Sequence, residues 1–537
     1  MYAAQNITPT VLDAMNGNVS EWYNECDNAI RRSEIVHGTY EYTTAVSYGN
    51  VGEFGEGSST TVDIACDRFH IISIDNSFLY VEQDIEIKPS AKLSDKKGCN
   101  GIFYVGYQYA PEVFMGYKIY SNSDLVQTVT WANYEWFALR NSVQPQAREQ
   151  TDQYATIEKI RRLDPNVPGV YVNLSGQTAA AVTKVKLKLR VPLSSFLIFR
   201  FLRYLPNWAG KISIELTPSK NNLVIAPTQD PFTIEAKATA QETFTAFCKN
   251  KVDLDFGFSN FNNEVNYYMK DNGGANVWDS VKFTCEQFEY KRIESRLAVY
   301  MLDPDISNAL AAKYIAVPLM FPIHQISVKD FAGEVGNQNP GAAGARTDIA
   351  LTTAMKHADT MFVLFRRTIN DYSCFYNPGI KYHINIDGKY YPREEYSTVE
   401  DMRSYNLTLD AMNFNNNFTT TINPEMQSSI MPYVKVWTHT GGQKTQYTNG
   451  DCSNFWLGIP FADSEDFMGG ISTVGTVQIQ YTGDRDGPDE LRAKKFTKPI
   501  ALFTEDALLK IRSMKPAGAP QIGITTASIE QILAAGQ

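Results

Sequence analysis

The sequence predicts an all-β protein built from two successive β-sandwiches. From about residue 40 onward, hydrophobic side chains recur mainly at every second position, which is the period of a half-buried strand. These stretches are short and are separated by clusters of Gly, Asp, Asn and Ser, as in sandwiches and barrels. A chain of 537 residues also suits two such domains.

Composition narrows the class of protein. Hydrophobic residues make up 43% and charged residues 20%, so the chain is globular, and 12% aromatic residues favour strands. A net charge of −10 argues against a protein that mainly grips nucleic-acid backbones. The seven scattered cysteines, without a Cys-x-x-Cys pair, indicate reduced thiols in a chain folded inside a cell. We find no secretory signal and no stretch near the roughly 20 apolar residues of a membrane helix.

The first half begins with a predicted arm or helix and continues with strands. Residues 9–35 carry Val11, Met15, Val19 and Trp22 at roughly helical spacing. Strands are expected within 39–49, 69–75, 78–88 and 101–109.

One helix is expected to interrupt these strands, near residue 123. Ser123 or Asp124 could cap it, and its apolar residues follow at steps of four, three, four and three. These apolar residues are Leu125, Val129, Ala132, Trp136 and Leu139.

Residues 184–217 predict a strand, a packed corner and a second strand. In the first strand Val185, Leu187, Leu189 and Val191 alternate with basic residues, and Pro192 ends it. The corner is rich in aromatic residues, and we expect them to fill a core or a contact between subunits. The candidates for such an interface are Phe196, Phe199, Phe201 and Trp208.

The basic side of the first strand has two interpretations. Lys184, Lys186, Lys188 and Arg190 lie within a segment that has no acidic residue from 165 to 214. A solvated strand face is the simpler one, since exposed strand positions are polar. The alternative is a surface that faces nucleic acid, lipid headgroups or an acidic protein.

The second half repeats this organisation. Residues 302–315 predict a short helix with Asp303 as its cap and Pro304 at its first position. Strands are expected at 360–367 and 476–482, and a hairpin that turns at Asp387-Gly388 is expected at 380–392. Residues 333–348 suggest an exposed loop, and 528–537 a short helix.

The predicted organisation has five parts. They are an N-terminal arm at 1–45, a first sandwich at 46–253, a connector at 254–280, a second sandwich at 281–500 and a C-terminal tail at 501–537.

Motifs for catalysis and for metal binding do not emerge from the sequence. The six histidines include no pair at metal-binding helical spacing, and no nucleophile elbow, zinc-protease motif or P-loop is present. Residues 484–487 start like a calcium loop, but Lys495 stands where a bidentate Glu is needed. Carboxylate pairs such as Glu394-Glu395 and Glu465-Asp466 could serve a glycosidase, but they also arise by chance in a chain with 59 acidic residues. We therefore predict no enzyme activity, no cofactor and no metal.

Four stretches together resemble the double jelly-roll major capsid proteins of the tectivirus–adenovirus lineage, most closely those of Polinton-like viruses, adintoviruses and virophages. KLRVPLSSFLIFRFLRYLPNWAGKISIELTPSKN, 188–221, is similar to their strand–corner–strand segment. The segments 350–373 and 380–406 are similar to their second jelly roll, and 455–483 to their closing segment. The likeness covers roughly residues 70 to 485, in the same order.

This resemblance implies two consecutive eight-stranded jelly rolls with short helices in the connections. It also implies homotrimers with a pseudo-hexagonal outline that tile an icosahedral shell around double-stranded DNA. Its partners would be further copies of the chain and penton and minor or cement proteins, without sequence-specific nucleic-acid binding, in a virion assembled inside the host cell. The alternative is a two-sandwich virion protein that binds carbohydrate or a receptor, for which Asn-rich residues 258–263 are the candidate loop.

Overall fold

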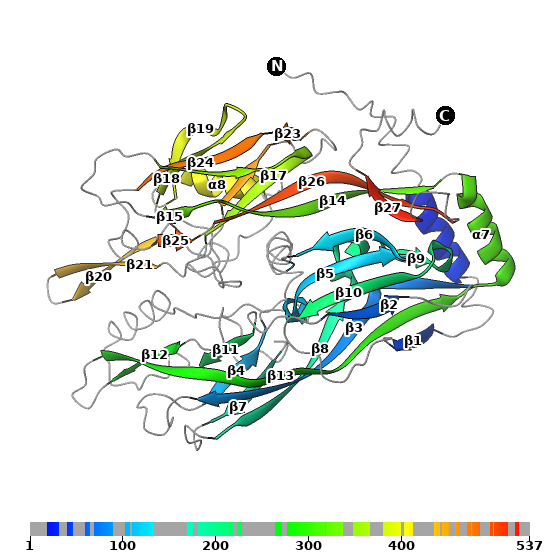
Figure 1. Ribbon diagram of the computed structural model, residues 1–537, viewed down its shortest axis with the longest axis horizontal. Helices are drawn as coiled ribbons and strands as arrows, with labels where there is room; N and C mark the ends of the chain where they lie inside the picture. The colour runs from blue at the N-terminus through cyan, green and yellow to red at the C-terminus, as the bar shows by residue number, and fades with distance from the viewer. Residues whose placement is uncertain are drawn as a thin grey trace.

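The computed structural model shows two β-sandwiches joined by a helix (Figure 1). The structure describes residues 19–31, 40–46, 59–64, 69–89, 102–107, 110–130, 132, 169–174, 181–200, 202–218, 223–227, 264–270, 276–316, 318–336, 347–365, 378, 380–398, 402–411, 434–440, 443–449, 457–461, 470–473, 475–483, 495–497, 499–513 and 521–525.

The first sandwich consists of two antiparallel sheets. One has the strand order β1 (Tyr40–Val46), β13 (Asn276–Met301), β3 (His70–Pro89) and β8 (Thr183–Pro192). The other has the order β2 (Thr60–Ile64), β10 (Ile212–Pro218), β5 (Phe114–Ser121) and β6 (Asp124–Val129). Five shorter strands extend this half, namely β4 (Ile102–Gly106), β7 (Gly169–Asn173), β9 (Tyr204–Pro206), β11 (Val224–Pro227) and β12 (Glu264–Lys270).

The second sandwich has the same plan. Its first sheet has the order β14 (Leu319–Asp330), β26 (Ile500–Ile511), β17 (Met355–Leu364) and β22 (Leu457–Pro460). Its second sheet has the order β16 (Thr347–Thr352), β24 (Thr476–Gly483), β18 (Ile380–Ile386) and β19 (Lys389–Ser397). Shorter strands accompany them, namely β15 (Glu334–Gly336), β20 (Val434–Thr440), β21 (Gln443–Asn449), β23 (Ile471–Thr473), β25 (Lys495–Thr497) and β27 (Ile522–Thr525).

Both sandwiches follow one winding rule. When the eight main strands of a half are numbered along the chain, one sheet has the order 1-8-3-6 and the other 2-7-4-5. Strands that follow one another therefore alternate between the two sheets, except that the fourth and fifth form a hairpin within one sheet, and the eighth strand returns to pair with the first. This is the order of an eight-stranded jelly roll, so the predicted fold class is confirmed in both halves.

The observed strand order places the boundaries of the two rolls at other residues than the sequence predicted. The eighth strand of the first roll, β13, runs from 276 to 301, so part of the expected connector and the start of the expected second sandwich belong to the first roll. Likewise β1 falls in the expected arm, and β26 falls in the expected tail. A closing strand pairs with the strand that opens its roll, far earlier in the sequence, and local composition does not reveal this pairing.

Individual strands and helices can be compared with those predicted from the spacing of hydrophobic residues. The strand at 184–191 is confirmed as β8, with its aliphatic side chains buried and its basic ones exposed. The helix expected within 302–315 is confirmed as α7 (Pro304–Ala316), and Asp303 Oδ1 accepts a hydrogen bond of 2.9 Å from the backbone N–H of Asp305. The hairpin is confirmed as β18–β19, with φ of 50° at Asp387 and 83° at Gly388.

The helix expected from residue 123 is wrong at residues 124–129. Residues 124–129 form strand β6, which pairs with β5, and Leu125 is 55% exposed although it was expected on a buried face. The β-branched Val126, Thr128 and Val129 favour an extended backbone, and pairing with β5 decides the conformation. The helix expected at 528–537 and most of the loop 333–348 lie outside the described residues.

The N-terminal helix and α7 lie together at one end of the molecule (Figure 1). Residues 19–31 are helical, as expected for part of 9–35. One hydrophobic cluster fills the first roll and continues into Leu319, Phe321 and Leu509 of the second half, while a separate cluster fills the second roll. None of the described helices is long and apolar enough to cross a membrane.

Candidate assembly interface

The aromatic corner after β8 packs inside the first roll. It consists of the short helices η3 (Leu193–Ser195) and α5 (Leu197–Arg200), and both Phe196 and Phe199 are 0% exposed. The Phe196 ring meets the edge of Tyr117 with centroids 5.0 Å apart, and the Tyr117 hydroxyl accepts a hydrogen bond of 3.2 Å from the Leu197 N–H. Of the two expected environments these two phenylalanines occupy a core, and full burial leaves them no surface for a neighbouring subunit. Phe201 lies outside the described residues.

Trp208 lies at a junction within the chain. It belongs to η4 (Asn207–Ala209), and its partly buried ring stacks on Tyr314 of α7 with centroids 5.8 Å apart. Trp22 of the N-terminal helix is fully buried and meets both rings edge-on, at 5.8 Å from Trp208 and 5.3 Å from Tyr314. Three separate segments therefore share one aromatic cluster, and a further contact of Trp208 with another subunit stays a prediction.

Polar contacts hold the N-terminal helix to both sides of this junction. Toward α7, Lys313 Nζ pairs with Glu21 at 2.7 Å and with Glu25, and the Tyr314 hydroxyl donates to Glu25 at 2.9 Å. Burial, with help from the Glu25 carboxylate, raises the pKa of Tyr314 well above its usual range, so its hydroxyl remains a donor. Toward the first roll, the Tyr204 hydroxyl donates to Asp27 at 2.7 Å.

A second set of contacts joins the C-terminal part of the chain to the first roll. Asn122, in the turn between β5 and β6, donates from Nδ2 to Gln521 Oε1 at 2.8 Å, and Gln521 Nε2 donates to the Trp208 carbonyl. Gly210 has a φ of 84°, and a Cβ there would lie 2.5 Å from Asn122 Nδ2. Glycine at 210 thus permits this close approach. The N-terminal helix and the segment that begins at Gln521 therefore both contribute contacts to the junction between the two rolls.

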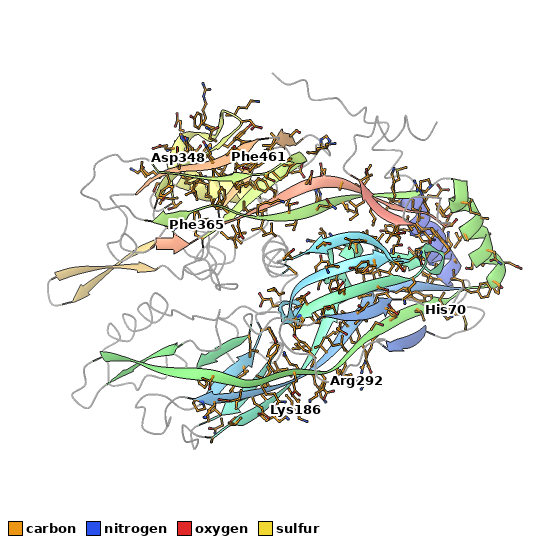
Figure 2. All side chains as sticks on the ribbon, viewed as in Figure 1. His70, Lys186, Arg292, Asp348, Phe365 and Phe461 are labelled. Carbon is orange, nitrogen blue, oxygen red and sulfur yellow. The ribbon has the colours of Figure 1, made fainter. Side chains whose placement is uncertain are left out.

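The basic strand β8 is matched by an acidic neighbour. In the antiparallel register Lys184, Lys186 and Lys188 stand opposite Glu86, Asp84 and Glu82 of β3. Lys184 Nζ lies 3.4 Å from Asp84 and 3.8 Å from Glu86. On the other side of β3, Arg292 of β13 stands opposite Glu82. Figure 2 labels Arg292 and Lys186, which belong to the strands on either side of β3. The structure therefore favours the simpler interpretation, a solvated strand face, since its charges are compensated within the sheet.

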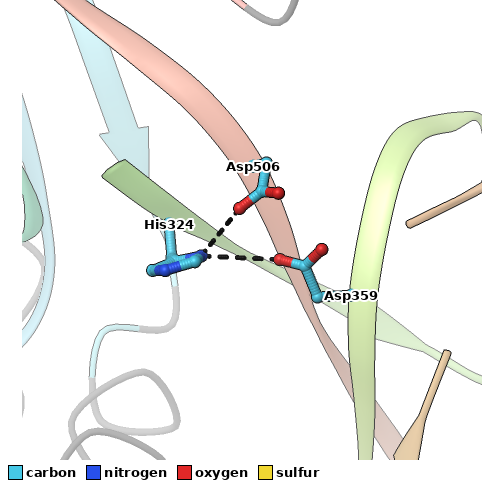
Figure 3. Close-up of side chains that lie close together, drawn as sticks. All are labelled: His324, Asp359 and Asp506. Atoms are coloured by element: carbon cyan, nitrogen blue, oxygen red, sulfur yellow. Dashed lines mark ion pairs between the residues drawn. The ribbon is translucent and has the colours of Figure 1, made fainter. Parts of the chain in front are cut away.

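One polar cluster in the second roll was not visible in the sequence. His324 on β14, Asp359 on β17 and Asp506 on β26 point toward one another across three neighbouring strands (Figure 3). His324 Nδ1 lies 2.9 Å from Asp506 Oδ1 and 3.4 Å from Asp359 Oδ2. Although burial lowers the pKa of His324, hydrogen bonds and charge from the two carboxylates raise it to about 9. Burial and the nearby Asp506 raise the pKa of Asp359 to about 6, against the lowering effect of His324.

The other polar residues considered in the sequence have ordinary environments where they are described. His383 is 8% exposed, its Nε2 lies 3.1 Å from Gln480 Oε1, and its ring packs on Tyr390. Glu394 is an exposed partner of Arg403 at 3.1 Å. The pair Glu465-Asp466, the turn 484–487 and the Asn-rich stretch 258–263 lie outside the described residues.

Comparison with known proteins finds likeness at the level of structure. No family model matches the sequence, and no curated protein matches it. A chain in the cryo-electron microscopy structure of the Sputnik virophage is 10% identical, with a TM-score of 0.50, over 93% of this chain and 90% of that one. The 537-residue protein is itself a double jelly roll. Other similar structures are the major capsid proteins of mavirus (12% identity, 92% of each chain, TM-score 0.47) and of Faustovirus (10%, 88% and 90%, 0.41).

Proposed function

We propose that this double jelly roll is the major capsid protein of an icosahedral virus with a double-stranded DNA genome. The observation that carries the proposal is the presence of two complete jelly rolls in one chain, wound in the same strand order. The fold likeness to a chain of the Sputnik virophage, over 93% of the length, supports it. The role is structural, and the chain acts by assembling with copies of itself in the virion.

The duplication also supports a homotrimer. Each chain supplies two units of the same topology, so three chains around a threefold axis supply six similar units. Such a trimer has a nearly hexagonal outline and can tile a shell. The contacts between subunits should be large, on the order of 2,000 Å² or more, as in other obligate assemblies.

A fixed angle between the two rolls is needed for this outline. The aromatic cluster of Trp22, Trp208 and Tyr314 ties the first roll and the N-terminal helix to α7, the helix that leads into the second roll. The hydrogen bonds of Gln521 to Asn122 and to the Trp208 carbonyl fix the angle from the C-terminal side. A chain whose function is to tile would gain from this rigid junction, whereas a flexible pair of binding modules would not require it.

The charge pattern fits a shell that encloses DNA without condensing it. The net charge is −10, and the three lysines of β8 stand opposite acidic residues of β3. By analogy with the resembled family, penton and minor or cement proteins would complete the shell inside the host cell.

Mass photometry of the purified full chain, with negative-stain imaging of the same sample, tests the proposal. We expect particles of three times 60.3 kDa with a hexagonal outline, or closed shells. A protein that stays a monomer or dimer at all concentrations would contradict it. Saturable binding on a glycan array by such a small species would then support the carbohydrate- or receptor-binding alternative.

A further inference from the structure

Three metal-ligand side chains converge on one point in the first sheet of the second roll. The facing atoms of His324, Asp359 and Asp506 all lie within 4.8 Å of one another (Figure 3). Each residue comes from a different strand, so the group is a product of the fold and not of a local turn.

Two features of the sheet bring His324, Asp359 and Asp506 together. His324 and Asp506 stand directly opposite each other in the register of β14 and β26. Asp359 enters through a bulge in β17, where the pairing with β26 shifts between Ala358 and Thr360. A bulge of this kind turns a side chain away from its regular direction, and here it turns Asp359 toward the other two residues.

Burial makes the two carboxylates costly unless positive charge compensates them. The side chain of Asp506 is 1% exposed and that of Asp359 is 13% exposed. Asp359 Oδ2, the oxygen that faces His324, is buried, and its distance of 3.4 Å from His324 Nδ1 is long for a hydrogen bond. A protonated imidazole would balance one of the two negative charges, whereas a dication would balance both.

We propose that His324, Asp359 and Asp506 bind one divalent transition-metal ion of the Zn²⁺ type. Ligand atoms about 2.0 to 2.2 Å from such an ion lie about 2.8 to 3.6 Å apart, depending on whether the angle between them is a right angle or tetrahedral. The distances of 2.9 and 3.4 Å from His324 Nδ1 to the two carboxylates fall in this range. An imidazole nitrogen beside two carboxylate oxygens favours zinc over calcium or magnesium, which prefer oxygen ligands alone.

The bound ion would have a structural role. It would cross-link the first, third and eighth strands of the second roll, which are far apart in sequence. The His324 side chain is 54% exposed, so an ion can reach the group from solvent and a water molecule can complete its coordination. This site does not depend on the capsid proposal, since it would stabilise the roll in any assembly.

Calorimetric titration of the chelator-treated full chain with Zn²⁺ tests the site, with Asp359→Asn as the principal variant. We expect one ion per chain, and at least about tenfold weaker binding in Asp359→Asn. Asp348→Asn is the matched control because Asp348 is an exposed aspartate on β16, in the other sheet of the same roll. The Asp348→Asn chain should bind Zn²⁺ with the same affinity as the unchanged chain.

A second measurement keeps the test decisive if Asp359→Asn does not fold. X-ray absorption of the unchanged chain with one equivalent of Zn²⁺ should show one imidazole among oxygen ligands, and His324→Gln should lose that imidazole. No Zn²⁺ binding by the unchanged chain would overturn the proposal. Equal affinity in Asp359→Asn, or a spectrum with several imidazoles or with sulfur ligands, would overturn it too.

Discussion

Replacing Trp22 by alanine tests whether the N-terminal helix joins the two jelly rolls. Trp22 is 0% exposed, and its ring meets the edges of Trp208 from the first roll and Tyr314 from α7. The substitution removes the part of this cluster that belongs to the helix and leaves the other two rings in place. It therefore changes the junction without altering a strand of either roll.

The expected loss in the free energy of unfolding is large. Replacing a buried tryptophan by alanine costs about 3 to 5 kcal/mol. Each edge-to-face aromatic pair contributes about 0.5 to 1.5 kcal/mol beyond the buried area, and Trp22 makes two, with ring centroids 5.8 and 5.3 Å apart. Since domains are typically stable by about 5 to 15 kcal/mol, this is a substantial share of the total.

Urea denaturation followed by circular dichroism, with a check for reversibility, measures the effect. Trp22→Ala should shift the transition of the junction to much lower urea, and Trp22→Phe should give an intermediate shift because one ring remains. Leu125→Ala is the control, because Leu125 is 55% exposed and its loss should cost no more than about 0.5 kcal/mol. If Trp22→Ala behaved like Leu125→Ala, the helix would not join the rolls as described.

Two further substitutions test the cores of the rolls. Phe199→Asp would bury an unpaired carboxylate at a position where the side chain is 0% exposed, so we expect insoluble protein on expression. Phe199→Leu is the control and should stay soluble. A soluble Phe199→Asp would show that the corner is open to water. Gly458→Ala would place a Cβ 2.8 Å from the Ala411 Cβ, where α8 (Met402–Ala411) packs on β22, and should cost about 1 to 3 kcal/mol in thermal or urea unfolding. Adding Ala411→Gly should restore part of this loss, and no recovery would contradict the proposed clash.

Sequence periodicity predicted those elements whose environment is local. The alternation of Val185, Leu187 and Leu189 with lysines gave β8 because one face of that strand is buried and the other is solvated. Asp387-Gly388 gave the β18–β19 hairpin because the turn requires positive φ at both positions. The number of sandwiches followed from chain length and strand spacing.

Features that depend on pairing between distant strands could not be predicted. Residues 124–129 have helical apolar spacing but form a strand because β5 pairs with them. The end of the first roll was missed because β13 belongs with β1, more than 200 residues away in sequence. His324, Asp359 and Asp506 carry no motif, since only the sheet order brings them together.

Cryo-electron microscopy of the purified oligomer tests the central claim most directly. A map with six jelly rolls around a threefold axis, two from each chain and both standing in equivalent positions, is the predicted result. The junction of Trp22, Trp208 and Tyr314 should be ordered in every copy. A map in which the two rolls of one chain adopt variable angles, or in which the chains form no threefold ring, would contradict the account.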